Sequence, residues 1–274
     1  IPNDPMVSAA PLVGFPRQQW NLFNLKLAGT DRNAWDVTTG LGNIIVAVID
    51  TGVSSTHPDL AGKISSLVDC STGTCAIVTS MTDAHAAGHG THVAGLVGAA
   101  TNNNEGIASS GYNTKIMVIK VMDASGMAET DNFLNAIRWA AEHGAKVINT
   151  SFGVVADGLP QAAINEYNNA VAYAWDRGVV VVAAAGNCRG NTNGRQGCEI
   201  RQNEGTVTGY AQNSKMYPAA SPHAISVAAA TVDNTIASYS EQNDASNANI
   251  GNWISVAAPG GDGANSSNSE WRTS

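Results

Sequence analysis

The sequence has few charged residues, and basic residues are the scarcest of them. Charged residues make up 13% of the chain, with 14 Lys and Arg against 22 Asp and Glu, so the net charge is −8 at pH 7. A protein that binds nucleic acid needs a basic patch to neutralise phosphates, and no such patch stands out, so we expect no nucleic-acid partner. The 43% of hydrophobic residues and the 28 glycines instead predict a closely packed globular protein rather than a disordered chain or a coiled coil.

Long hydrophobic runs are also missing. No apolar run reaches the length needed to cross a bilayer, so no membrane span is predicted. The first residues lack the basic and apolar regions of a signal peptide, which indicates a mature or processed start.

Cysteine is limited to four residues, which form two close pairs, Cys70/Cys75 and Cys188/Cys198. Each pair brackets residues typical of surface loops, and no histidine lies at a zinc-binding spacing from either pair. We therefore predict two local disulfides, in preference to free thiols. Disulfides of this kind are typical of a secreted, extracellular protein.

Apolar, β-branched segments alternate with amphipathic ones along the chain, as in α/β proteins. We expect strands at 44–49, 115–122, 146–152, 179–185, 224–230 and 253–257, and helices at 89–100, 130–143 and 161–177. The alternation predicts a three-layer fold, in which a central, mostly parallel sheet is flanked by helices. No repeat or linker divides the chain, so residues 1–274 are expected to form a single domain, with residues 1–30 as an irregular N-terminal arm.

Three polar side chains are expected at one edge of this sheet. Asp50 ends the strand 44–49, His89 lies between two glycines where a helix begins, and Asn187 follows the strand 179–185. In α/β folds, ligands and catalytic groups gather at the carboxyl ends of parallel strands. A carboxylate can orient an imidazole, and an amide NH₂ can donate to an oxyanion, so the three groups suit acyl transfer but still require a nucleophile. Taken singly, Asp50 could also be an ordinary turn residue.

Seven segments of the chain, in family order between about residues 18 and 260, resemble motifs of the subtilisin family of serine endopeptidases, and most of all its exported bacterial members. They are Ala47-Val48-Ile49-Asp50-Thr51-Gly52-Val53, His57-Pro58-Asp59-Leu60, His89-Gly90-Thr91-His92-Val93-Ala94-Gly95, Ile148-Asn149-Thr150-Ser151-Phe152-Gly153, Ala184-Ala185-Gly186-Asn187, Tyr217-Pro218-Ala219 and Ala258-Pro259-Gly260. The resemblance implies a subtilisin-like fold and the hydrolysis of polypeptide substrates.

The resemblance also implies a role for individual residues. Asp50 would orient His89, His89 would act as general base and acid, and Asn187 would donate to the oxyanion. The residues expected to line the substrate cleft are Ser151, Phe152 and Gly153 on one edge, Ala184 and Gly186 on the opposite wall of the primary pocket, and Ser125 and Gly126 beside the next apolar subsite. The motif further implies a cis peptide bond before Pro218.

A loop rich in asparagine resembles a structural calcium site of the family. Carboxylate, amide and carbonyl oxygens are the ligands that calcium prefers. The expected ligands are Asp59, Thr101, Asn103, Glu105 and Ile107, with Gln18 or Gln19 of the arm as one more. The alternative is an ordinary Asn-rich loop. No organic cofactor is expected.

The sequence departs from the family pattern in two places. The family's nucleophile lies in a Gly-Thr-Ser-x-Ala segment after the motif at 258–260, and residues 261–274 contain no such segment, because Ser274 follows Arg-Thr. We expect this chain to be the N-terminal part of a protease, inactive alone, whose partner is the C-terminal remainder of the same protease; a prodomain or inhibitor is a further possible partner. The second departure is Met216, where the family often has a small residue, and it is expected to narrow the primary pocket.

Two functions compete with this prediction. The chain is a catalytically inactive subtilisin-like scaffold or binding module if no nucleophile completes it. A metal-dependent hydrolase using His85, His89 and His92 is a remote alternative, because these residues are spaced by four and three. Glycines at 88 and 90 argue against one continuous helix through all three histidines.

Overall fold

The computed structural model describes residues 1–7, 19–29, 31–122, 127–189, 198–202, 206–247 and 250–261. The chain forms two compact units, one built mainly from residues 1–151 and the other from residues 152–175 and 180–271. Each unit is described by itself below. That residues 1–274 act as a single domain stays a prediction.

The first unit contains five strands of a mostly parallel sheet, in the order β5-β1-β4-β2-β3. The strands are β1 (Ile45–Asp50), β2 (Ile64–Asp69), β3 (Ala76–Val78), β4 (Lys115–Lys120) and β5 (Ala145–Thr150). All neighbours are parallel except β3, which runs antiparallel to β2. β1 and β4 contain continuous apolar runs, at 45–49 and 116–119, as expected of parallel strands that are covered on both faces.

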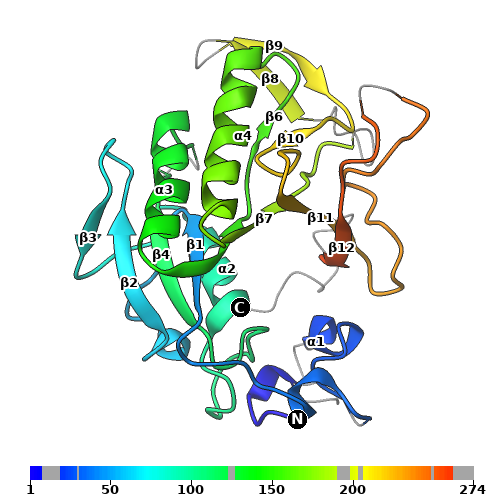
Figure 1. Ribbon diagram of the computed structural model, residues 1–274. Coiled ribbons are helices and arrows are strands. Elements are labelled where there is room, and N and C mark those ends of the chain that lie inside the picture. The colour runs from blue at the N-terminus through cyan, green and yellow to red at the C-terminus, as the bar shows by residue number, and fades with distance from the viewer. Residues whose placement is uncertain are drawn as a thin grey trace. The chain divides into compact units, whose positions relative to one another are not determined.

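Two helices pack against this sheet and make the layers visible in Figure 1. Helix α2 (His89–Gly98) contacts β1 and β4, and helix α3 (Thr130–Glu142) contacts β5 and β1. Gly98 lets α2 approach β4 closely, because a Cβ there would lie 2.5 Å from Cγ2 of Ile116. The parallel sheet between helices confirms the predicted α/β three-layer class.

The described parts of the N-terminal arm, residues 1–7 and 19–29, contain short helical segments that the sequence did not predict. It contains a 3₁₀ turn at Pro5–Val7 and the short helix α1 at Trp20–Asn24. Val7 and Leu22 are fully buried and pack in one cluster with Ala28 and Ala108. Two more 3₁₀ turns, Ala34–Asp36 and Pro58–Leu60, belong to the same unit. Burial of these apolar side chains, which local composition does not reveal, explains the difference.

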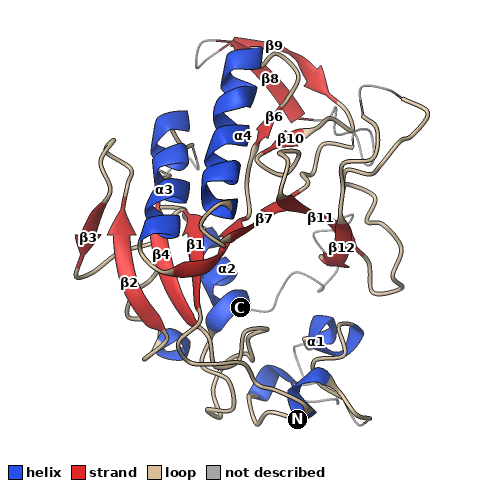
Figure 2. Cartoon of the chain, in the orientation of Figure 1, coloured by secondary structure: helices blue, strands red, loops and turns tan. Residues whose placement is uncertain are grey.

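The second unit contains helix α4 (Gln161–Trp175) and three parallel strands in the order β12-β11-β7. These are β7 (Val180–Ala184), β11 (Ala224–Ala230) and β12 (Val256–Pro259) (Figure 2). β12 was expected at 253–257 and begins three residues later. Two small antiparallel pairs were not predicted: β6 (Val154–Val155) with β10 (Met216–Tyr217), and β8 (Cys198–Gln202) with β9 (Thr206–Ala211). Each is too short or too polar to produce a clear pattern.

Both predicted disulfides are present, Cys70–Cys75 in the first unit and Cys188–Cys198 in the second. The peptide bond between Tyr217 and Pro218 is cis, as the motif implies. None of the described helices has the length and hydrophobicity that a bilayer crossing requires.

Candidate active site

Asp50 and His89 form a hydrogen-bonded pair in the first unit. The Nδ1 atom of His89 lies 2.7 Å from Oδ1 of Asp50. The Asp50 side chain is fully buried, whereas 44% of the His89 side chain is exposed. Because Nδ1 is engaged by the carboxylate, Nε2 is the nitrogen left for proton exchange at the surface. This geometry suits an imidazole that the carboxylate orients through Nδ1 and that acts as a general base through Nε2.

Glycines bring the two residues together. Gly90, the second residue of α2, lies against the turn after β1, where a Cβ would lie 2.2 Å from the carbonyl oxygen of Gly52 and 3.1 Å from Oδ1 of Asp50. Any side chain at position 90 would therefore push the helix away from the carboxylate. Gly88, the residue before the helix, has φ of +67°, a conformation that glycine adopts without strain.

A second carboxylate, Asp83, supports the pair and was not predicted. Its Oδ1 accepts hydrogen bonds from Thr51 Oγ1 at 2.7 Å and from the His85 amide at 3.0 Å. Its Oδ2 accepts from both the amide and the hydroxyl of Thr91, each at 2.7 Å. Asp83 thus joins the turn after β1 to the first turn of α2, where a negative charge also complements the helix dipole.

The two carboxylates set the proton affinity of His89. The hydrogen bond to Asp50 raises the pKa of His89, and the negative charges of Asp50 and Asp83 raise it further against the opposing effect of burial. Burial raises the pKa of Asp83, but hydrogen bonds from Thr51 and Thr91 outweigh it and hold that pKa below its usual value. Asp83 is therefore an anion at neutral pH, and its charge favours the protonated form of His89.

Replacing Asp83 by asparagine should lower the pKa of His89, because it removes one of the negative charges that favour the imidazolium. NMR titration of the His89 ring, compared between the two proteins, measures the shift directly. Asp31→Asn, which removes an exposed carboxylate elsewhere, is the matched control. An unchanged His89 pKa in Asp83→Asn would show that Asp83 only stabilises the connection between the turn after β1 and α2.

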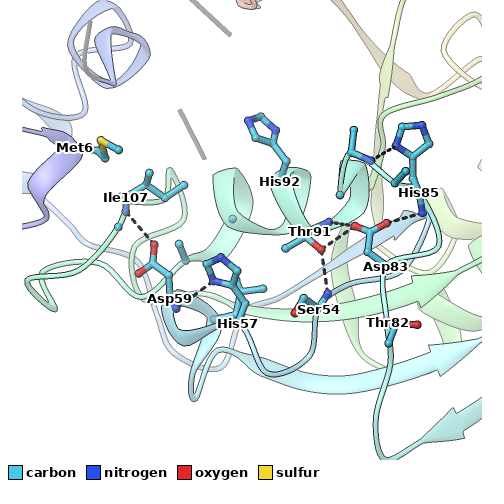
Figure 3. A pocket seen from close by; sticks show the side chains of 17 residues that line it. Met6, Ser54, His57, Asp59, Thr82, Asp83, His85, Thr91, His92 and Ile107 are labelled. Carbon is cyan, nitrogen blue, oxygen red and sulfur yellow. Dashed lines mark hydrogen bonds between the residues drawn. The ribbon is translucent and has the colours of Figure 1, made fainter. Parts of the chain in front are cut away.

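A pocket of about 510 Å³ lies along one face of α2 (Figure 3). Asp83, His85 and His92 line it, together with His57 and Ile107 at its other end. Burial lowers the pKa of His92, and the charge of His89 adds to that effect. The pKa of His92 is therefore lower than that of His89, and His92 loses its proton first as the pH rises.

The metal-dependent alternative is not supported. Within the described ranges, no three His, Cys, Asp or Glu side chains come together in a way that could hold a metal ion. His85 lies in the loop before α2, and His89 is turned to Asp50. The helix begins only at His89, after the left-handed Gly88, so His85 lies outside it and the three histidines do not share one helix face.

The predicted calcium loop and Asp59 do come together. Asp59 is 4% exposed, and its carboxylate accepts hydrogen bonds from the Asn103 side chain at 3.0 Å and from the Ile107 amide at 2.9 Å. A Cβ at Gly106 would lie 2.3 Å from the same carboxylate.

Asp4, which the sequence did not indicate as a site residue, also binds this loop. Asp4 is 2% exposed and accepts from the amides of Asn102 and Asn103. Gln19 instead pairs with the backbone of Ala108 through both ends of its amide. Of the other predicted ligands, Thr101 and Glu105 lie in the same loop, and Gln18 falls outside the described residues.

The predicted pocket walls in the second unit enclose Met216. A Cβ at Gly186 would lie 2.7 Å from Cγ of Met216, and a Cβ at Gly153 would lie 3.5 Å from its Cε. The Met216 side chain is 7% exposed and therefore occupies the space between these two glycines. Gly153 also has no room for a side chain, because its Cβ would lie 2.6 Å from the Tyr217 carbonyl oxygen.

The remaining predicted residues occupy different positions. Asn187 is exposed just after β7 in the second unit, and Ala184 is the last residue of that strand. Ser151 directly follows β5 and accepts a hydrogen bond from Asn149, and Phe152 is partly buried. Ser125 and Gly126 lie outside the described residues. That Asp50, His89 and Asn187 share one edge of the sheet stays a prediction.

Comparisons with known proteins support the resemblance to subtilisin-like proteases. The profile of the Subtilase family matches residues 42–274. Thermitase of Thermoactinomyces vulgaris is 39% identical over 229 residues, which are 83% of this chain and 66% of thermitase. A thermophilic serine proteinase of a Bacillus species is 37% identical over 84% of this chain and 47% of that protein. The chain thus spans about half to two thirds of the length of these relatives.

Solved structures show the same fold. A protease structure from Pseudoalteromonas arctica matches with a TM-score of 0.69 and 28% identity, over 98% of this chain and 75% of that one. Sphericase matches with a TM-score of 0.65 and 31% identity, over 88% of this chain and 72% of that one.

Proposed function

Because the chain belongs to the subtilase family, we propose that it supplies the acid, base and oxyanion donor of a serine endopeptidase that cleaves polypeptides. The observation that carries this proposal is the bond between the buried Asp50 carboxylate and the half-exposed His89 ring. The nucleophilic serine is proposed to lie outside residues 1–274, in the C-terminal remainder of the same protease.

The residues present can perform the proton transfers of peptide hydrolysis. Nε2 of His89 would take the proton of the serine hydroxyl as the serine attacks the peptide carbonyl, and would return it to the leaving amine. Asp50 would stabilise the imidazolium formed in between and keep the ring in the tautomer with its proton on Nδ1. Asn187 would donate its side-chain amide to the oxyanion of the tetrahedral intermediate.

A fluorophosphonate probe for serine hydrolases tests this proposal. The full-length protease should gain one covalent adduct, which peptide mapping should place on a serine outside residues 1–274. His89→Ala should abolish the labelling, since the serine would no longer be activated. If the folded full-length protein is not labelled, the chain is the scaffold of an inactive relative that binds without cleaving.

The substrate is proposed to bind as an added strand along Ser151, Phe152 and Gly153, the mode by which extended peptides often dock on exposed backbone. Its side chain before the cleaved bond would enter the space between Gly153 and Gly186. Met216 fills that space, so the protease should prefer small side chains there.

Met216→Gly should open this pocket to large apolar side chains. We expect kcat/KM for substrates with Phe before the cut to rise about 10- to 100-fold relative to those with Ala, the range that burial of such a side chain supplies. A peptide library compared between variants measures the preference. Met216→Leu keeps the volume and should keep the preference. An unchanged preference in Met216→Gly would show that Met216 does not form the pocket.

A structural calcium ion is proposed at the loop 101–107. Asp4 and Asp59 are both buried, and neither forms an ion pair with a basic side chain in the described part of the chain, so a cation would offset their charge. Asp59, the Asn103 side chain and backbone carbonyls of the loop are the donors that suit calcium, which would neutralise the carboxylates and stiffen the loop. We propose no catalytic role for the ion.

Calcium should raise the melting temperature by about 5–10 °C when its concentration exceeds the dissociation constant 100-fold, because binding to the folded state alone stabilises by about 2.7 kcal/mol. A chelator should reverse the shift. In Asp59→Asn the melting temperature should no longer respond to calcium, while magnesium should give little effect on either protein. An equal calcium response in both proteins would place the ion elsewhere.

Secretion is proposed on two grounds. Both disulfides require an oxidising environment, and one relative, 33% identical over 89% of this chain, is an extracellular protease of Xanthomonas campestris.

A further inference from the structure

A buried carboxyl group lies beneath the turn that carries Asn187. Glu241 is fully buried in the second unit. Its Oε2 accepts a hydrogen bond from the Cys188 amide at 2.7 Å, and its own amide donates to the carbonyl of Gly186 at 3.3 Å. Glu241 therefore holds the residue before Asn187 and the residue after it, while Asn187 itself stays exposed between them.

The two contacts belong to a wider set that fixes the same turn. The Cys188 carbonyl accepts from the Asn213 amide at 3.1 Å, and the Asn213 side chain accepts from the Gln242 amide at 2.8 Å. Cys188 is also fully buried and disulfide-bonded to Cys198. Without Glu241, the Cys188 amide would be a buried donor with no acceptor, which typically costs about 1–3 kcal/mol. The turn would then be expected to shift.

Burial of the Glu241 carboxyl group disfavours its charged form. Burial raises the pKa of Glu241 to about 7, although the amides of Cys188 and Ser214 and the charge of Arg189 act in the opposite direction. The Oε1 atom is buried and has no hydrogen-bond partner among the described residues. The hydrogen bond that Oε2 accepts from the Cys188 amide is one that an apolar side chain at position 241 could not form.

We propose that Glu241 is a positioning residue that holds Asn187 in the orientation needed to donate to the oxyanion. The inference rests on the role of Asn187 in the proposed function and adds the group that controls it. Glu241 itself does not touch the substrate; its side chain binds the amide of Cys188, directly after Asn187, while its backbone amide binds Gly186, directly before it.

The test is a double-mutant cycle in the full-length protease. Glu241→Ala should lower kcat about 10- to 100-fold and leave KM within about threefold, since an oxyanion donor acts mainly in the transition state and its full loss costs about 10²–10³. In the Asn187→Ala background, Glu241→Ala should cost less than about twofold more. Glu241→Gln, which keeps an acceptor for the Cys188 amide, should restore most of kcat.

Ser240→Ala is the matched control. Ser240 is the neighbouring residue and is fully buried. Its hydroxyl accepts a hydrogen bond from the Ala229 amide at 2.9 Å, so Ser240→Ala also leaves one buried backbone amide without its acceptor. It should lower the melting temperature without changing kcat. Equal losses of kcat from Glu241→Ala in the wild-type and Asn187→Ala backgrounds would overturn the proposal, because Glu241 would then not act through Asn187.

Hydrogen exchange of the Cys188 amide separates the two proposals. Exchange should be faster in Glu241→Ala than in the wild-type protein and close to wild type in Glu241→Gln. If the protease is active and the exchange rate does not change, only the positioning role fails. If the wild-type full-length protease has no activity, the proposed function fails and the role of Glu241 with it. If Glu241→Ala does not fold, Glu241→Ser, whose side chain is smaller than glutamate but still polar, replaces it in each of these experiments.

Discussion

Replacing Asp50 by asparagine should lower kcat of the full-length protease about 10⁴-fold, the size of loss that follows when the carboxylate of such a triad becomes an amide. Asparagine occupies the same space, but its NH₂ group would face Nδ1 of His89 and favour the wrong tautomer. The pKa of His89 should also fall, because the hydrogen bond to Asp50 is the largest influence that raises it. Steady-state kinetics and an NMR titration of His89 measure both effects.

The control for this variant is Asp31→Asn, which removes an exposed carboxylate from the same unit and should leave kcat unchanged. A loss of only tenfold in Asp50→Asn, together with an unchanged His89 titration, would contradict the assignment. Because Asp50 is buried, its substitution could also destabilise the fold. Unfolding would lower the melting temperature and the far-ultraviolet circular dichroism signal, and these measurements distinguish it from a purely catalytic loss.

Asn187→Ala should lower kcat by about 10²–10³ and change KM little, because its amide would bond strongly only to the oxyanion formed in the transition state. Asn187 is exposed after β7, so its truncation should leave the melting temperature almost unchanged. Asn165→Ala, which truncates an exposed asparagine on α4, is the matched control and should have no effect on either constant. If Asn187→Ala raised KM and spared kcat, the amide would bind the ground state instead.

The three predicted helices and the strands with continuous apolar runs lie close to where the sequence placed them. The runs that became β1, β4 and β7 are apolar on both faces, which periodicity detects directly. The short pairs β6–β10 and β8–β9 carry too few residues for a period, and they form because tertiary contacts bring their partners together.

Part of the site was also visible in the sequence. The pairing of Asp50 with His89 followed from two motifs, and the glycine between His89 and Thr91 proves necessary because no Cβ fits against Gly52. Supporting residues were not visible. Asp83, Asp4 and Glu241 are ordinary acidic residues in loops, and nothing in their neighbours distinguishes them from exposed ones.

The fold class and the family could be read from the sequence, which also indicated Asp50, His89 and Asn187 as candidate residues, because short apolar runs and glycine-bounded motifs encode local backbone geometry. Which carboxylates are buried, and which groups they bind, depends on the tertiary structure. Glu241 reaches Cys188 across 53 positions of the chain, and Asp4 reaches Asn102 across 98. Contacts of this kind exist only after the elements have packed, since a buried hydrogen bond depends on which distant segments exclude water around it.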